Sequence, residues 1–471
     1  MVFTSQIFLF YFLPLALLGY YALPQRWRNL FLTLASYVFY GWWSPWFVTL
    51  MLASTVVDWF CGVAITAPDA APASRKRAVT ISVVTNLALL GFFKYFMFAQ
   101  ENINRLMEVF GSDSHFTLTV ILPVGISFYS FQSMSYSIDL YQGTAKRARS
   151  FRDFACYVSM FPQLVAGPIV RYHDIATQLD DRPQHGELFY RGALNFMIGF
   201  AKKILIANTL GEVSDLALAA ESLPAHVAWF GILAQGLQLY FDFSGYSDMA
   251  IGLGQMFGFV MPLNFFAPYR ALSMSEFWTR WHISLSNWLR DYVYIPLGGN
   301  RGSAWFTNKN LMITMFLGGL WHGAAWTFIA WGVCHGLVLV TERLLGEDSW
   351  YARLPDPLRM FRSAMYFSFS LVLWRVPDLG TAAQYYSALV LGVDASTGDA
   401  AQGAVMAARV YQPAYVFVML IAVGITWLSP LHWIKRVESS TALTLATFAL
   451  FLLSIVAMYS QAENPFLYFR F

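Results

Sequence analysis

The sequence predicts an all-α polytopic membrane protein with about 11 transmembrane helices, and three observations carry this prediction. First, 57% of the 471 residues are hydrophobic and 12% are charged, against about 45–50% apolar and about 25% charged in an average soluble domain. Second, charges are absent from long blocks, several of which reach the roughly 20 residues that a helix needs to cross a bilayer. Third, the apolar runs are continuous rather than alternating. A soluble enzyme, a nucleic-acid binder and a disulfide scaffold are excluded. The charge-free blocks are 1–25, 29–57, 116–138, 249–269, 310–341, 410–434 and 439–462.

Eleven segments are predicted to cross the membrane, and three others are predicted to be re-entrant or interfacial. The three are 154–170, 275–290 and 311–321, which are short or interrupted. Such backbone is tolerated at membrane depth only when it is buried in protein or lines a cavity. We interpret residues 1–471 as a single membrane domain. The predicted spans are roughly 5–23, 29–43, 46–65, 79–99, 119–138, 188–209, 227–257, 324–343, 363–391, 413–434 and 441–460.

The charges of the short loops predict an orientation. Basic residues gather at 75–77 and 146–152, whereas the loops at 100–118 and 211–226 are mainly acidic. Because basic loops stay in the cytoplasm, we expect a periplasmic N-terminus and a cytoplasmic segment at 259–310. The apolar N-terminus has neither a basic leader nor a cleavage site of small residues. It is therefore interpreted as a retained span rather than a signal peptide.

A first group of polar side chains lies inside a predicted span. Asp242, Ser244, Tyr246 and Asp248 follow one another within the segment 227–257, where an ionisable residue costs about 2.5–3.5 kcal/mol on insertion scales. Six residues separate the two carboxylates, which places them about 240° apart around a helix. They do not share a face, so separate hydrogen-bonded roles are favoured over a catalytic pair.

The eight histidines provide the second group. Five lie in loops or near span ends and are interpreted as solvated or interfacial. His322 differs because it lies in the charge-free block 310–341 with glycines on both sides. A buried imidazole that stays neutral can act as a base, but a core histidine bonded to a carbonyl is an equal alternative. The five peripheral histidines are His115, His173, His185, His226 and His432.

The two remaining histidines have a packing interpretation on pattern alone. If 275–290 is one amphipathic helix, His282 shares its apolar face with Trp278, which favours a structural role. His335 is interpreted as a packing residue. The Gly-Gly pairs at 298–299 and 318–319 indicate tight turns or helix packing rather than phosphate loops. The three cysteines are widely spaced and are interpreted as buried free thiols, and no metal-ligand spacing is present.

At these positions the sequence resembles the membrane-bound O-acyltransferases. The similarity is greatest to the bacterial branch that O-acetylates alginate and other exopolysaccharides, with the teichoic-acid D-alanylation protein as a relative. The resemblance covers nearly the whole chain. The motifs are 161–171 (FPQLVAGPIVR), 240–252 (YFDFSGYSDMAIG), 281–286 (WHISLS), 290–301 (RDYVYIPLGGNR), 319–324 (GLWHGA) and 464–471 (NPFLYFRF).

The resemblance implies a site and a fold. The family's invariant histidine falls on His322, which would be catalytic at the neck of a tunnel, as a general base or as a nucleophile. Its second, more variable polar position falls on His282, which would be a second catalytic residue that orients the donor or helps stabilise the oxyanion. A central tunnel with a cytoplasmic funnel is expected. Supporting polar residues would be Asp242, Ser244, Tyr246, Asp248 and Asn300. Cationic residues could attract an anionic donor, although positive-inside topology is the favoured explanation for them: Arg270, Arg280, Arg290, Arg301 and Lys309.

The resemblance also implies a reaction. A cytoplasmic thioester, acetyl-CoA or an acyl carrier, would supply the acyl group, and no cofactor would be bound. The product would be an O-acetylated exopolysaccharide such as alginate or cellulose, reached through a periplasmic SGNH (esterase-fold) acetyltransferase within a secretion complex at the bacterial inner membrane. Two other classes remain open: a transporter or flippase for an acyl carrier or polysaccharide, and a passive scaffold.

Overall fold

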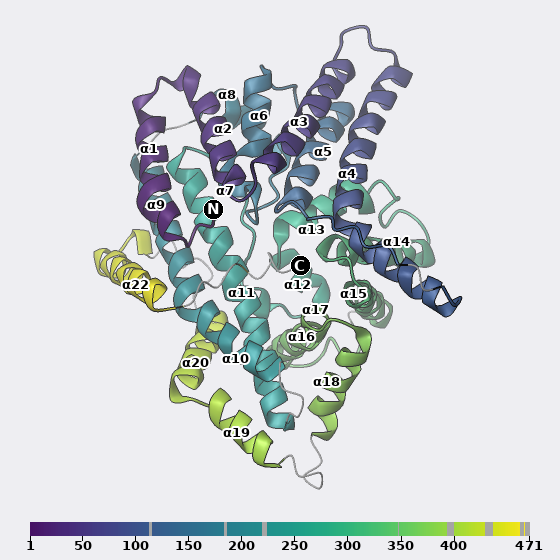
Figure 1. The fold of residues 1–471 in the computed structure, drawn as a ribbon, viewed down its shortest axis with the longest axis vertical. Helices are drawn as coiled ribbons and strands as arrows, with labels where there is room; N and C mark the ends of the chain where they lie inside the picture. Colours follow the sequence, from purple (N-terminus) through teal and green to yellow (C-terminus); the bar gives the residue numbers. More distant parts are fainter. Residues whose placement is uncertain are drawn as a thin grey trace. The chain divides into compact units, whose positions relative to one another are not determined.

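The computed structural model is helical wherever it describes the chain (Figure 1). Helices are joined by turns and loops, and the described ranges contain no strand, so the predicted all-α class is confirmed. The motif at 464–471 lies outside the described residues except for Phe466. The structure describes residues 1–112, 115–182, 186–218, 224–346, 348–392, 400–428, 437–461 and 466.

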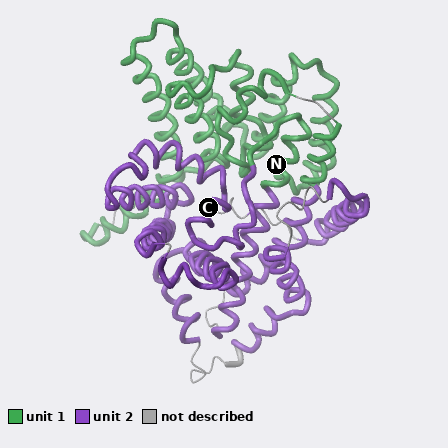
Figure 2. The backbone as a smooth tube through the Cα atoms, turned by 180° about the vertical axis from the view of Figure 1, so that it is seen from behind, with its two compact units in different colours: residues 1–196, 247–262 green, residues 197–246, 263–471 purple. Residues whose placement is uncertain are grey.

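The chain forms two compact units, each assembled from two separate segments (Figure 2). Unit 1 consists of Met1–Phe196 and Ser247–Pro262, and unit 2 of Met197–Tyr246 and Leu263–Phe471. The long helix α11 (Ala225–Met256) contributes residues to both.

Unit 1 is held together by helix packing around buried polar links. Helices α3, α4 and α5 pack against one another, and α2 packs on α6. The buried Asp58 of α3 accepts hydrogen bonds from Ser82 (2.5 Å) and Asn86 (2.8 Å) of α4 and from Ser133 of α5. The helices of this unit are η1 (Phe8–Phe12), α1 (Leu13–Ala22), α2 (Gln25–Gly41), α3 (Pro45–Ile65), α4 (Pro72–Val109), α5 (Ile126–Gln142), α6 (Phe151–Ser159), α7 (Phe161–Leu164), α8 (Tyr172–Asp180) and most of α9 (Gly186–Ala201).

Unit 2 contains both histidines that the sequence singles out. Its hydrophobic core includes Phe277, Trp281, Trp331, Phe367 and Trp374. Besides part of α11, its helices are η2 (Lys202–Ala207), α10 (Asn208–Leu218), η3 (Pro268–Arg270), α12 (Met274–Arg280), α13 (Ile283–Leu289), η4 (Arg290–Tyr294), α14 (Ala304–His322), α15 (Trp326–Leu345), α16 (Asp356–Ser370), α17 (Val372–Arg375), α18 (Leu379–Leu391), α19 (Ala400–Val410), α20 (Pro413–Leu428) and α22 (Thr441–Ser460).

Several helices are long and apolar enough to cross a membrane. In the described ranges, length and hydropathy identify five, or six if the bent pair Gly403–Val410 and Pro413–Leu428 is one span. A multi-pass membrane protein is therefore supported, and the count of about 11 crossings stays a prediction. The five are Pro45–Ile65, Pro72–Val109, Gly186–Leu218, Trp326–Leu345 and Thr441–Ser460.

Two predicted segments differ from the structure in a way that matters for the site. The expected span 363–391 is broken into α16, α17 and α18. The segment 275–290 is not one amphipathic helix, because α12 ends at Arg280 and α13 begins at Ile283. Between them His282 has a φ of 44°, a left-handed conformation that a continuing helix does not contain. The predicted shared face of Trp278 and His282 is therefore wrong.

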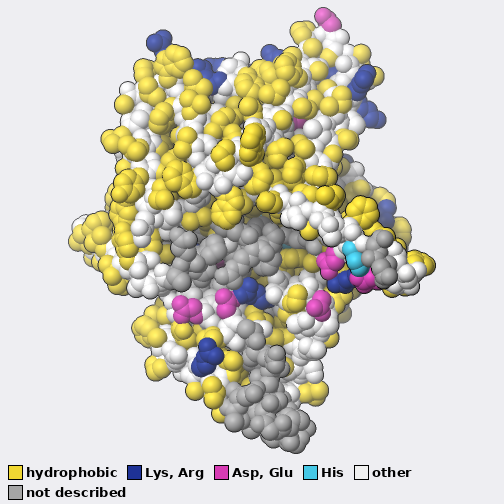
Figure 3. Space-filling view, viewed as in Figure 1, with side chains coloured by type: hydrophobic (Ala, Val, Ile, Leu, Met, Phe, Trp, Pro, Cys, Tyr) yellow, Lys and Arg dark blue, Asp and Glu magenta, His cyan; other side chains and the backbone are white. Residues whose placement is uncertain are grey.

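The surface suits a lipid environment. On the face drawn in Figure 3, hydrophobic side chains cover most of the helices of unit 1, and Lys and Arg side chains gather at their upper edge. Exposed apolar residues recur along α1, including Leu15 and Leu18 with 66% and 69% of their surface exposed. Apolar exposure on this scale is typical of a surface that lipid covers rather than water.

Helices α14 and α15 approach each other at two glycines. A Cβ atom on Gly319 would lie 2.5 Å from the carbonyl oxygen of Phe328 and 3.0 Å from the Cα of Gly332. A Cβ on Gly332 would lie 2.6 Å from the carbonyl oxygen of Met315. By contrast, Gly318 has only the Leu289 Cδ1 atom nearby, at 3.5 Å. The prediction of helix packing at 318–319 therefore holds for Gly319.

We expect Gly319→Ala to destabilise the protein and Gly318→Ala to have little effect on stability. The added methyl at 319 meets backbone, which cannot rotate away, and overpacking of this kind costs about 1–3 kcal/mol. The measurement is the apparent Tm of each variant in detergent. Equal Tm values for the two variants would contradict this close contact.

Candidate functional site

His322 is the last residue of α14 and is enclosed by tryptophans. Its side chain is buried, with 4% of its surface exposed. Its ring centroid lies 4.7 Å from that of Trp374, 5.1 Å from that of Trp331 and 5.1 Å from that of Trp321. The indole rings give the imidazole an apolar environment. The carbonyl end of α14 favours a positive charge at this position, so the surroundings support an imidazole that gains a proton.

A cavity of about 970 Å³ connects His322 with the protein surface. It lies wholly within unit 2, between α12, α13, η4, α14, α15 and α16. Buried His322 and Trp331 line it, and so does exposed Arg343. A volume of this size is in the range of sites for small molecules. The cavity also carries an excess of cationic side chains, namely Arg290, Arg343, Arg359 and Arg362 against Glu342.

His282 lies at the break between α12 and α13, and its side chain is 1% exposed. Its Nδ1 atom lies 3.1 Å from Oδ1 of Asn264. Its ring contacts those of Phe243, at 4.6 Å, and Trp321, at 5.9 Å. Trp321 therefore touches both His282 and His322. Burial lowers the pKa of His282 well below its usual value, so this imidazole is neutral.

The wall formed by α12 is fixed by Glu342 of α15. The Glu342 carboxylate accepts the backbone N–H groups of Met274 (2.9 Å) and Ser275 (3.0 Å) at the start of α12. The hydroxyl of Tyr351 donates to the same carboxylate at 2.8 Å. A carboxylate at a helix N-terminus is stabilising because it pairs with unsatisfied N–H groups. Glu342 is thus bonded to α12 and to Tyr351. The four arginines of the cavity outnumber it, so the cavity has a net positive charge.

The predicted polar residues of α11 do not gather at one place. Asp242 forms a buried ion pair with Lys203 of η2, at 2.6 Å. Ser244 is buried, and Tyr246 is buried with its ring 4.8 Å from that of Phe466. Asp248 belongs to unit 1. Asp242 thus has a structural partner, the separate roles of the two carboxylates stay a prediction, and none of the four residues lines the cavity.

Of the predicted donor-side residues, only some line the cavity. Arg290 lines the cavity and pairs with Asp291 at 2.7 Å. Arg280 forms an ion pair with Glu276 at 2.6 Å and does not line the cavity, nor do Arg301 and Asn300. Sequence reasoning missed Arg343, Arg359 and Arg362, which lie 40–80 residues further along the chain. Residues 342–362 contain four basic and four acidic residues, so local charge gives no signal that would single out these arginines.

His335 takes part in a buried network behind Trp331. The Ser370 hydroxyl donates to the carbonyl oxygen of Phe367 (2.7 Å) and therefore accepts from Trp331 Nε1 (3.2 Å) and His335 Nε2 (3.0 Å). The packing interpretation of His335 agrees with this burial.

The cysteine interpretation is partly wrong: Cys61 and Cys156 are buried, but Cys334 is exposed. In the described ranges, no group of three His, Cys, Asp or Glu side chains is placed to hold a metal ion.

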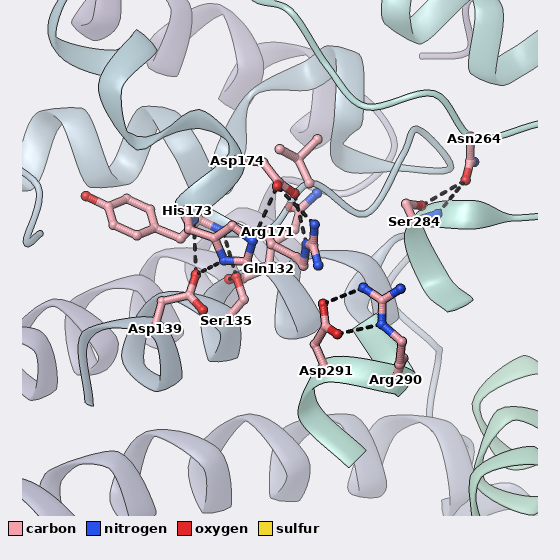
Figure 4. Close-up of polar contacts among 12 residues, drawn as sticks. Gln132, Ser135, Asp139, Arg171, His173, Asp174, Asn264, Ser284, Arg290 and Asp291 are labelled. Atoms are coloured by element: carbon pink, nitrogen blue, oxygen red, sulfur yellow. Dashed lines mark hydrogen bonds and ion pairs between the residues drawn. The ribbon is translucent and has the colours of Figure 1, made fainter. Parts of the chain in front are cut away.

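A separate polar cluster in unit 1 surrounds His173, as Figure 4 shows. Its Nδ1 atom lies 2.9 Å from Oδ2 of Asp139, which also accepts the His173 backbone N–H at 3.0 Å. Its Nε2 atom lies 3.3 Å from Asp174, whose carboxylate also binds Arg171. The hydrogen bond to Asp139 raises the pKa of His173. This histidine is thus held by two carboxylates rather than simply solvated.

A helical membrane protein with a buried, aromatic-walled histidine on a cationic cavity has the elements of a membrane enzyme. Comparison with known proteins identifies its class. Residues 145–348 match the membrane-bound O-acyltransferase family. The probable alginate O-acetylase of Azotobacter vinelandii is 41% identical, with the whole of both chains covered.

More distant relatives have other substrates in their names. The peptidoglycan O-acetyltransferase of Helicobacter pylori is 36% identical over 83% of this chain and 80% of its own. The teichoic acid D-alanyltransferase of Streptococcus thermophilus is 30% identical over 50% of this chain and 59% of its own. The chain belongs to the membrane-bound O-acyltransferase family. The predicted family and the predicted enzyme class, an O-acyltransferase, are confirmed.

The His173 cluster predicts a dependence of stability on pH. Because the folded pKa lies above the unfolded value of about 6.5, the protonated histidine contributes its full stabilisation below that value. The contribution is lost as the pH rises through the folded pKa. The apparent Tm of the wild type should exceed that of His173→Gln most at about pH 5.5, and the gap should shrink in alkali. A gap that does not change with pH would contradict this.

Proposed function

We propose that this protein transfers acetyl groups from a cytoplasmic thioester toward an exopolysaccharide such as alginate, with His322 as the catalytic residue. The observation that carries the proposal is the position of His322, buried among tryptophans on a cavity that also holds four arginines. The alginate O-acetylase relative, aligned over its full length, supports the class of acceptor and the treatment of residues 1–471 as one acyltransferase domain.

In the proposed reaction His322 acts as a general base. The acceptor hydroxyl attacks the thioester carbonyl carbon while its proton moves to the His322 ring. The C–S bond then breaks, and the imidazolium returns the proton to the departing thiolate. The carbonyl end of α14 stabilises the imidazolium, an effect of about 0.3–1 kcal/mol and up to about 2 kcal/mol in buried geometries. His282, joined to His322 through Trp321, would position one of the reactants.

The donor would enter through the cationic end of the cavity. Acetyl-CoA and acyl carriers both bear phosphate next to a thioester arm, and arginine binds phosphate by charge-assisted hydrogen bonds. Positive-inside charge predicts that residues 259–310, which bring Arg290 to the cavity, face the cytoplasm, with the N-terminus in the periplasm and the chain in the inner membrane. The acceptor would be a periplasmic SGNH acetyltransferase of the secretion complex, which then acetylates the polymer.

We expect His322→Ala to abolish acetylation of the polymer in cells, because no other residue would take the hydroxyl proton. Loss of a general base costs about 10²- to 10⁴-fold in rate. His226→Ala is a matched control, since His226 is exposed and does not line the cavity. The readout is the acetyl content of the secreted polymer, with the membrane level of each variant checked. Normal acetylation by an inserted His322→Ala protein would refute the assignment.

Arg343, the exposed arginine of the cavity, should affect donor binding rather than the chemical step. Arg343 has no hydrogen bond or ion pair to another described residue and is exposed, so its removal should leave the fold intact. We expect Arg343→Gln to raise the KM for the thioester about tenfold, which corresponds to about 1.4 kcal/mol, with kcat little changed.

Arg353→Gln is the control for this experiment. Arg353 is an exposed arginine near the same helix end but does not line the cavity, and its KM should stay at the wild-type value. An unchanged KM in Arg343→Gln, or an equal rise in Arg353→Gln, would contradict donor entry at this end.

A further inference from the structure

We infer that Asn264 is a positioning residue that fixes the tautomer of His282, so that Nε2 of His282 serves the reaction as a hydrogen-bond acceptor. This inference rests on the proposed function. Asn264 is fully buried, with 0% of its surface exposed, in the loop before η3. It lies in none of the sequence motifs that point to the acyltransferase family.

Three donors converge on one oxygen of Asn264. Its Oδ1 atom lies 3.2 Å from the backbone nitrogen of Ser284, 2.9 Å from Oγ of Ser284 and 3.1 Å from Nδ1 of His282. Figure 4 shows the two bonds to Ser284. The main chain repeats this link, because the Asn264 carbonyl accepts the N–H of Ile283 at 2.9 Å. The loop is therefore bonded to the residues on the C-terminal side of His282.

These contacts determine the direction of the amide. The backbone N–H of Ser284 can only donate, so the amide atom that faces it must be the oxygen. The same oxygen faces Nδ1 of His282 and can only accept. Nδ1 therefore carries the hydrogen, and since a neutral imidazole has a single N–H, Nε2 is left as a bare lone pair.

The Nε2 atom is buried and has no hydrogen-bond partner among the described residues. A buried acceptor without a partner costs about 1–3 kcal/mol. The left-handed backbone of His282, with φ 44°, adds about 1–3 kcal/mol for a residue with a side chain. An unsatisfied buried acceptor and a strained backbone at the same residue are typical of a site that is preorganised for a substrate.

The tautomer restricts what His282 can do. With its hydrogen on Nδ1 and its charge removed by burial, His282 has no proton on Nε2 to donate to an oxyanion. Its lone pair can instead accept an O–H or N–H from a reactant. His282 does not line the cavity described above, so this role requires a reactant that reaches between the rings of Phe243 and Trp321, which contact the imidazole. His282 can therefore orient a reactant but cannot stabilise an oxyanion.

The direct test is solid-state NMR of the full-length protein in lipid bilayers with ¹⁵N-labelled histidine. The difference spectrum between wild type and His282→Gln gives the His282 signals. We expect a protonated Nδ1 and an unprotonated Nε2 at neutral pH. A protonated Nε2, or an imidazolium, would overturn the inference. This readout does not require acetyl transfer, so it is independent of the proposed function.

Three variants then test the role of the amide. Asn264→Leu keeps the side-chain size but removes the acceptor, and should lose the Nδ1–H tautomer and lower kcat by roughly 10- to 100-fold, as for other supporting hydrogen bonds. Asn264→Asp keeps the acceptor and should retain the tautomer and restore most of kcat. Ser284→Ala removes a different donor from the same oxygen and should retain the tautomer.

The outcomes separate this inference from the proposed function. If His322→Ala and His282→Ala abolish transfer but Asn264→Leu leaves kcat unchanged, the role of Asn264 is refuted and the proposed function stands. If His322→Ala, His282→Ala and Asn264→Leu all transfer acetyl normally, the proposed function itself fails. Should Asn264→Leu be absent from the membrane, the wild-type spectrum and the Asn264→Asp variant decide.

Discussion

The close contact between α14 and α15 is the constraint on which the site depends. Gly319 lies against the backbone of Phe328 and Gly332, and this contact brings Trp331 of α15 beside His322 at the end of α14. Any side chain at Gly319 would separate the two helices and open the imidazole to water. The absence of a Cβ atom at Gly319 and at Gly332 therefore determines how closely Trp331 can pack against the imidazole of His322.

The cavity beside this contact combines aromatic and charged groups. Trp331 lines it next to His322, and two of its arginines have partners of their own: Arg290 pairs with Asp291, and Arg362 donates to the carbonyls of Tyr351 and Leu272. Glu342 is used to hold α12. The four arginines can thus attract an anion, which fits the proposed thioester donor because that donor bears phosphate.

Much of this could be predicted from the sequence. The charge-free blocks give the membrane class, and His322 stands out because it lies inside one of them between glycines. The break at His282 could not be predicted, since the pattern of 275–290 fits a continuous helix and the left-handed residue depends on bonds from a distant loop. The contact of Asn264 with His282 and that of Lys203 with Asp242 could not be predicted either, because local periodicity does not report contacts between different segments. For the same reason the sequence did not place Arg343 at the cavity.

The central claim is that His322 takes part in breaking a thioester. It is tested most directly by mixing the purified wild-type protein or His322→Ala with acetyl-CoA labelled in the acetyl group, then measuring free thiol and acetylated protein. The account predicts thiol release or an acetylated protein with the wild type and neither with His322→Ala. Binding of the donor without thiol release by the wild type, as a transporter or flippase would give, or equal release by both proteins, would contradict it.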